Sequence, residues 1–200
     1  MKRIAVLASG RGSNFQALID AVCEGLIPGR LIALLTDNPD AYAVVRATDA
    51  GIPVMVIDYM AYSSRTGYEA ALRGAMRRSG ADLFVLAGYM RILDPGTVQE
   101  FRGRVINIHP ALLPSFPGLH AQRQALAHGV KVAGCTVHFV DEETDHGPII
   151  LQACVPVLED DDEDTLAERI LLQEHMCLQE AVRLFCEGRL RIEGRLVHTC

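Results

Sequence analysis

The feature that most constrains the fold is the regular alternation, over the first half of the chain, of short apolar runs and segments with a helical pattern. The apolar runs, rich in β-branched residues and bounded by Gly, Pro or Asp, are Ile4–Ala8, Leu31–Leu35, Val54–Ile57, Leu83–Ala87 and Val105–Ile108. Helical patterns lie between them near residues 14–24, 41–50, 67–79 and 95–102. Continuous apolar strands with intervening helices indicate a parallel sheet that is buried on both faces. We therefore expect an α/β fold with a Rossmann-like, doubly wound, mostly parallel sheet.

The pattern changes from about residue 132, where the predicted strands become longer and antiparallel. The expected elements are strands at Val132–Val140 and Ile149–Val157, a long helix near 163–187 and a terminal hairpin formed by Leu190–Ile192 and Leu196–His198. No linker, repeat or low-complexity stretch divides the sequence, and 200 residues suffice for one sizeable core. We expect a single domain over residues 1–200.

Composition excludes several classes of protein. A net charge of -6 and a pI near 5.6 argue against general nucleic-acid binding, which needs a basic surface. No apolar run approaches the roughly 20 residues of a membrane span, and the first one is too short for a signal peptide. The six cysteines show no CxxC spacing, so we expect reduced core residues and no metal site. These features predict a cytoplasmic protein that acts on small molecules, without nucleic-acid or membrane partners.

A carboxamide and an imidazole stand two residues apart at the end of the fifth apolar run, directly before a proline-rich loop. Asn107 and His109 share one face if this run is a strand, because strand side chains alternate. Ligands of α/β sheets gather at the carboxyl ends of the strands, which favours a site here. The alternative is a strand end that simply reaches solvent. Asp145, in the acidic loop before Gly147, is either a turn residue or the partner of His109.

The first strand leads into Ser9-Gly10-Arg11-Gly12-Ser13-Asn14-Phe15. Glycines permit a tight turn, and free N–H groups at the start of a helix form an anion site, above all for phosphate. Phe15 stands where a dinucleotide fingerprint has its third glycine, although Asp37 could serve as the ribose-binding acid. A single phosphate, a dinucleotide and a purely structural turn all remain open.

The long helix near 163–187 carries a carboxylate inside its apolar stripe. The stripe is formed at helical spacing by Leu166, Ile170, Cys177, Leu178, Ala181 and Phe185, and Glu174 falls within it. A buried charge needs a partner, a ligand or a path to solvent. Ligand binding and snorkelling at the edge of the stripe are both compatible with the pattern.

Taken together, these motifs resemble those of the folate-dependent formyltransferases, and among them the phosphoribosylglycinamide formyltransferases. The matching pieces are Gly10–Asn14, Leu86–Leu93, Asn107–His120, Val137–Pro148 and Gln173–His175, which together span roughly residues 4–192. Relatives that act on methionyl-tRNA or hydrolyse formyltetrahydrofolate normally carry a further domain, for which we expect no room here. Two positions depart from the common pattern, Ala111 where many relatives have Ser and His146 where many have a small residue. They put loop geometry in doubt rather than the polar set.

The resemblance implies formyl transfer from 10-formyltetrahydrofolate to the amine of N1-(5-phospho-D-ribosyl)glycinamide in purine biosynthesis, by a monomer or homodimer without a metal. In that reaction Asn107 and His109 would stabilise a developing oxyanion, and Asp145 would orient His109. The implied ribonucleotide-binding residues are Gly12, Ser13, Asn14, Gln173 and Glu174. The implied folate-binding residues are Arg65, Met90, Arg91, Ile92, Leu93, Asn107, Asp141, Glu142, Glu143, Thr144 and Asp145. A dinucleotide-dependent oxidoreductase and a non-catalytic nucleotide sensor are the rival classes.

Overall fold

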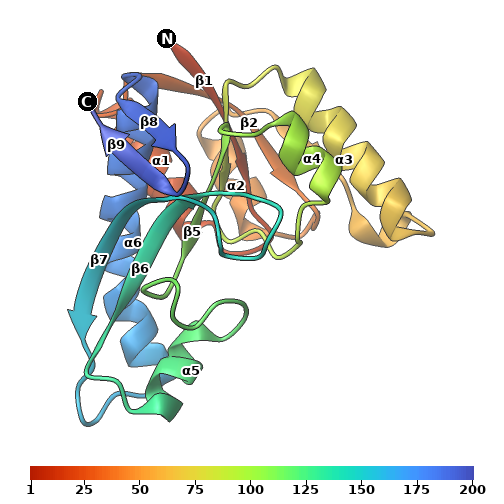
Figure 1. Ribbon diagram of the computed structural model, residues 1–200. Helices are drawn as coiled ribbons and strands as arrows, with labels where there is room; N and C mark the ends of the chain where they lie inside the picture. Colours follow the sequence, from red (N-terminus) through yellow and green to blue (C-terminus); the bar gives the residue numbers. More distant parts are fainter. The chain divides into compact units, whose positions relative to one another are not determined.

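The computed structural model describes residues 1–200, which form two compact units, Met1–Ile106 and Asn107–Cys200. Seven strands belong to one mixed, mostly parallel sheet with the order β3-β2-β1-β4-β5-β6-β7, and two further strands form a separate hairpin (Figure 1). The predicted α/β class, with a doubly wound sheet and late antiparallel additions, is confirmed. The single-domain assignment stays a prediction.

The unit Met1–Ile106 has a parallel sheet at its centre. Strand β1 (Lys2–Leu7) pairs with β2 (Gly29–Thr36) and with β4 (Leu83–Leu86), and β2 pairs with β3 (Val54–Val56). The helices of this unit are α1 (Ser13–Cys23), α2 (Tyr42–Asp49), the 3₁₀ turn η1 (Tyr59–Ala61), α3 (Arg65–Ser79) and α4 (Pro95–Glu100). The middle residues of β1 and β4 are fully buried, which is why both read as continuous apolar runs.

The unit Asn107–Cys200 combines an antiparallel strand pair with one long helix. Strand β6 (Val132–Phe139) pairs with β7 (Ile149–Pro156), and α6 (Glu163–Cys186) packs against both. Helix α6 begins with a capping box formed by Asp162 and Thr165. The hairpin of β8 (Leu190–Glu193) and β9 (Leu196–Thr199) follows, with β9 in contact with β7. Figure 1 shows α6 behind the two long strands and the hairpin beside its last turns.

Strand β5 (Val105–His109) contains the point at which the two units meet in the sequence. It ends at His109, so Asn107 and His109 lie at its carboxyl end as predicted, and the proline-rich loop follows at once. That loop leads into α5 (Ala121–His128), which contacts α6. Helix α5 and the 3₁₀ turn η1 were not predicted from the sequence.

The cysteines correct one expectation. All six are free, and Cys135 is a buried core residue, as expected. Cys23, Cys154 and Cys200 are exposed, so their interpretation as core residues was wrong. An apolar local sequence places a residue on an element without fixing which face of that element it occupies.

Candidate active site

The proline-rich loop after β5 is fixed to the strand pair β6–β7 by two polar side chains. The Thr136 hydroxyl donates to the Ala111 carbonyl over 2.6 Å and accepts from the Leu113 N–H over 3.0 Å. The Gln152 amide donates to the Leu113 carbonyl over 2.9 Å. These bonds make the loop turn back toward the end of β5, and Phe116 adopts a left-handed conformation with φ 54°. The carbonyl and N–H groups of the loop thereby reach the polar side chains of the strand end.

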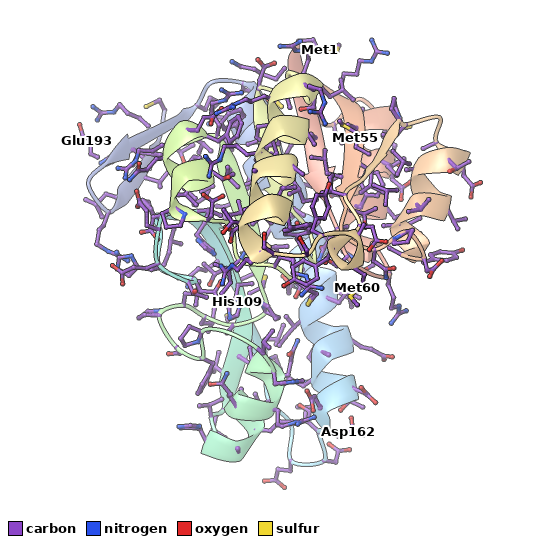
Figure 2. All side chains as sticks on the ribbon, turned by 90° about the vertical axis from the view of Figure 1, so that its right-hand side faces the viewer. Met1, Met55, Met60, His109, Asp162 and Glu193 are labelled. Carbon is purple, nitrogen blue, oxygen red and sulfur yellow. The ribbon has the colours of Figure 1, made fainter.

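His109 has an acceptor opposite each ring nitrogen. Its Nε2 lies 2.9 Å from the carbonyl oxygen of Phe116, and its Nδ1 lies 3.3 Å from Oδ2 of Asp145. A carbonyl and a carboxylate can only accept, so the doubly protonated imidazolium satisfies both contacts. His109 is 5% exposed, and Figure 2 labels its position. The imidazole is thus held at both of its ring nitrogens.

Asp145 is the centre of the polar cluster in this unit. Its Oδ2 accepts the N–H of Gly118 over 2.7 Å in addition to facing His109, and its Oδ1 accepts Nδ2 of Asn107 over 3.4 Å. Asp145 is in the left-handed region with φ 52°, which an Asp tolerates better than most residues. The structure therefore brings Asn107, His109 and Asp145 together around one carboxylate, although Asp145 is 36 positions from His109 in the chain.

His138 completes the cluster and was not among the residues singled out from the sequence. Its Nδ1 lies 2.9 Å from the Phe139 carbonyl, so that nitrogen carries the proton, and its Nε2 accepts from Nδ2 of Asn107 over 3.2 Å. Burial lowers the pKa of His138, and the nearby Asp145 only partly opposes this shift. A neutral His138 therefore fixes the orientation of the Asn107 carboxamide. The only sequence signal was its place in the matching segment Val137–Pro148, because a lone His in an apolar strand usually indicates a core position.

In the unit Met1–Ile106, α1 begins at Ser13 with Gly12 as its N-cap, and no side chain caps it. The first N–H groups of an uncapped helix are oriented toward any anion placed there. Gly12 has φ +67°, and a Cβ on it would lie 2.8 Å from Cβ of Ala43. Glycine is therefore required at position 12 by backbone conformation and packing, independently of any ligand. Ser13 and Asn14 lie in the first helical turn.

A cleft of about 450 Å³ lies in the same unit, lined by Ser9, Asp37, Asp58, Tyr59, Met90 and Arg91 among others. Nε of Arg91 donates to Oδ2 of Asp37 over 2.8 Å, and the guanidinium lies 3.8 Å from the Tyr59 ring centre. The hydrogen bond to Asp37 raises the pKa of Arg91. The Asp37 side chain is 4% exposed and is paired with Arg91, which disfavours the dinucleotide alternative.

The remaining predicted folate residues of this unit differ in exposure. Met90 and Ile92 are 63% and 64% exposed, and both are available to cover an apolar ring. Leu93 is 6% exposed and belongs to the core, so only its main chain is available to a ligand. Arg65 is exposed at the start of α3, where its Nε lies 2.6 Å from Oε1 of Glu69. The structure does not bring Arg65 into the group that lines the cleft.

The other predicted residues of the unit Asn107–Cys200 lie on α6 and in the loop between β6 and β7. Glu174 is 8% exposed on α6, and Gln173 beside it is half-buried. Oδ1 of Asp141 accepts the Glu143 N–H over 3.1 Å. Glu142, Glu143 and Thr144 are exposed. No group of three or more His, Cys, Asp or Glu side chains is arranged to hold a metal ion, and no helix combines the length and apolar character of a membrane span.

Comparison with known proteins places this chain in a family. The formyl transferase family model matches residues 2–182. The phosphoribosylglycinamide formyltransferase of Escherichia coli strain K12 is 44% identical over 189 residues, which cover 94% of this chain and 89% of that protein. The crystal structure of glycinamide ribonucleotide transformylase 1 from Symbiobacterium toebii superposes with a TM-score of 0.97 at 55% identity, covering 100% of this chain and 94% of that one.

A longer relative contains the same region as one part of a larger protein. The trifunctional purine biosynthetic protein adenosine-3 of Drosophila melanogaster is 49% identical over 189 residues. The match covers 94% of this chain but spans only 14% of that protein's length. The chain belongs to the formyl transferase family.

Proposed function

We propose that this enzyme transfers the formyl group of 10-formyltetrahydrofolate to the amine of N1-(5-phospho-D-ribosyl)glycinamide, giving the N2-formyl product and tetrahydrofolate in purine biosynthesis. The observation that carries the proposal is the cluster in which Asn107 and His109, at the end of β5, lie against the Asp145 carboxylate. This chain covers nearly the whole length of two relatives that bear the corresponding name.

The proposed chemistry needs a donor for an oxygen that gains charge and a route for one proton. Attack by the amine nitrogen forms a bond to the formyl carbon, whose bond to N10 of the folate then breaks, and one proton passes from the amine to N10. The Asn107 carboxamide and the His109 imidazole stabilise the negative charge on the formyl oxygen by exchanging a partner within the protein, His138 for Asn107 and the Phe116 carbonyl for His109, for that oxygen. The effect is worth roughly 3–4 kcal/mol per donor. Asp145 keeps His109 oriented, because its Oδ2 lies 3.3 Å from Nδ1 of the imidazole.

Substrate binding is assigned to residues of both units. Gly12, Ser13 and Asn14 bind the ribonucleotide phosphate, since α1 lacks a side-chain cap. Gln173 and Glu174 accept hydrogen bonds from the ribonucleotide. The folate is bound by Arg65, Met90, Arg91, Ile92 and Leu93, and by Asn107 and the loop Asp141–Asp145. Exposed Met90 and Ile92 support this assignment for an apolar ring.

The remaining proposals concern the whole protein. We place it in the cytoplasm as one formyltransferase domain over residues 1–200, monomeric or homodimeric, with small-molecule substrates and no nucleic-acid partner. The net charge of -6 supports the last point.

The test is a folate assay with purified protein. We expect tetrahydrofolate to appear only when both 10-formyltetrahydrofolate and glycinamide ribonucleotide are present, with one N2-formyl product per tetrahydrofolate. Rapid formate release without the ribonucleotide would instead assign the chain to hydrolysis. A nicotinamide dinucleotide that binds or is reduced would support the oxidoreductase alternative.

A further inference from the structure

The tip of the C-terminal hairpin carries an arginine that contacts the loop between β6 and β7. Glu193 pairs with Leu196 across the hairpin, which leaves Gly194 and Arg195 as the two turn residues. Gly194 takes φ +58°, the left-handed conformation that the first position of such a turn needs. The hairpin base is closed by the Cys200 N–H, which donates to the Arg189 carbonyl over 2.9 Å. Figure 1 shows the hairpin turn beside the start of the loop after β6, and Figure 2 shows Glu193 at the molecule's edge.

Arg195 binds His146 through both its ring and its main chain. Nη1 of Arg195 lies 2.7 Å from Nε2 of His146, and Nη2 donates to the His146 carbonyl over 2.9 Å. Nδ1 of the same imidazole lies 2.7 Å from Oδ2 of Asp141. A guanidinium cannot accept a hydrogen bond and a carboxylate cannot donate one. Nη1 of Arg195 also lies 3.3 Å from Nδ1 of the imidazole. His146 is therefore held between Asp141 and Arg195.

His146 lies between two residues whose positions are tightly defined. Asp145, directly before it, has a left-handed backbone and makes the hydrogen bonds to Gly118 and Asn107 described above. Gly147, directly after it, packs so closely on the main chain that a Cβ would lie 1.8 Å from the Phe139 carbonyl oxygen. An imidazole and a carbonyl fixed by Arg195 thus hold the loop immediately beside the Asp145 carboxylate.

We propose that Arg195 is a positioning residue for formyl transfer: through His146 it holds the loop 141–147 so that Asp145 faces His109. This inference rests on the proposed function and adds to it a residue outside the segments that resemble the formyltransferases. The hairpin holds the loop in place. One planar guanidinium contacts both the ring and the carbonyl of His146, which explains why residue 195 is an arginine. A lysine carries the same charge but cannot present that two-pronged donor.

The experiment compares Arg195→Ala with a control on the same hairpin. Arg191→Ala removes an equal charge, and the ion pair of Arg191 is with the exposed Glu193 on the hairpin itself. We expect Arg195→Ala to lower kcat about tenfold, because a small misplacement of a positioned group costs turnover. The KM for the ribonucleotide and the Tm should stay close to the wild-type values. Arg191→Ala should keep kcat within about twofold, and Arg195→Lys should fall between the two.

Two further measurements make the result decisive. Added to Asp145→Asn, the Arg195→Ala change should cost little, because both act on one group. Amide hydrogen exchange should become faster in a peptide spanning residues 142–147 of Arg195→Ala and stay unchanged in Arg191→Ala. A kcat within twofold of wild type, or wild-type exchange in that peptide, overturns the proposal. If the wild-type protein shows no formyl transfer, the proposed function fails, whereas the exchange comparison still decides whether Arg195 holds the loop.

Discussion

In the unit Asn107–Cys200, the polar side chains of the candidate site hydrogen-bond to one another, whereas in Met1–Ile106 the site consists of main-chain groups and partly exposed side chains. The Asp145 carboxylate has contacts with Asn107, His109 and Gly118, all made within the protein. At the start of α1, by contrast, no side chain occupies the cap. We infer that the hydrogen-bonded cluster around Asp145 is preorganised to stabilise charge and transfer protons. The start of α1 is open and is suited to binding a ligand. This difference leads to measurable expectations.

The largest effect is expected at His109, the imidazole proposed to stabilise the charge on the formyl oxygen. His109→Ala should lower kcat by roughly 10³-fold with little change in either KM, as for an interaction made mainly in the transition state. Adding Asp145→Asn should then cost less than it does in the wild-type protein, because the two residues act as a unit. Tetrahydrofolate release measures both. If the fold-losses in kcat of the two single variants simply multiply in the double variant, Asp145 does not act through His109. Near-normal turnover of His109→Ala would contradict the assignment of chemistry to the unit Asn107–Cys200.

A smaller effect, on binding rather than turnover, is expected at the start of α1. Ser13→Asp places a carboxylate where the phosphate is proposed to lie, so the KM for the ribonucleotide should rise at least about tenfold through like-charge repulsion. The Tm should be unchanged or higher, since a carboxylate in the first turn favours the helix dipole. Gln122→Glu makes the same charge change in the first turn of α5 and serves as the control. An unaltered KM in Ser13→Asp would contradict phosphate binding there.

Glu174 sharpens the comparison, because it is a proposed binding residue in the unit otherwise assigned to chemistry. Glu174→Gln keeps the size of this buried side chain and removes its charge. We expect the KM for the ribonucleotide to rise about fivefold, kcat to stay within about twofold and the free energy of unfolding not to fall. Normal substrate binding together with a clear loss of stability would show that Glu174 has a structural role.

The smallest effect concerns the pH dependence of stability at His138. Because burial lowers its pKa in the folded protein, the unfolded chain takes up a proton below the ordinary value of 6.5 that the folded chain does not. Stability is therefore complete above that pH and falls as the pH decreases below it, by up to about 1.4 kcal/mol per pH unit. Urea unfolding at pH 7.5 and 5.5 should show a smaller loss for His138→Gln than for the wild type. Equal losses would mean that His138 is not held neutral.

The sheet could be predicted from the sequence because its strands are buried on both faces and read as apolar runs. Helix α5 was missed for a local reason: it is short, and its N-cap, His120, lies in the left-handed region and makes no side-chain cap hydrogen bond. Asn107 and His109 were identified because strand alternation places them on one face. His138 and the contact of Arg195 with His146 were not, because their partners lie 31 and 49 positions away and follow only from tertiary structure.

The glycines at positions 12 and 147 affect how a library of sequence variants of this protein should be interpreted. Their side-chain space is closed by Ala43 and by the Phe139 carbonyl, so folding alone already excludes other residues at both positions. A screen of a random library for folded protein would keep these glycines even if every member were inactive. The same screen has no such packing reason to retain the hydroxyl of Ser13. Retention of Gly12 and Gly147 therefore indicates only that a variant folds. A growth selection that requires turnover is needed to identify the residues on which catalysis depends.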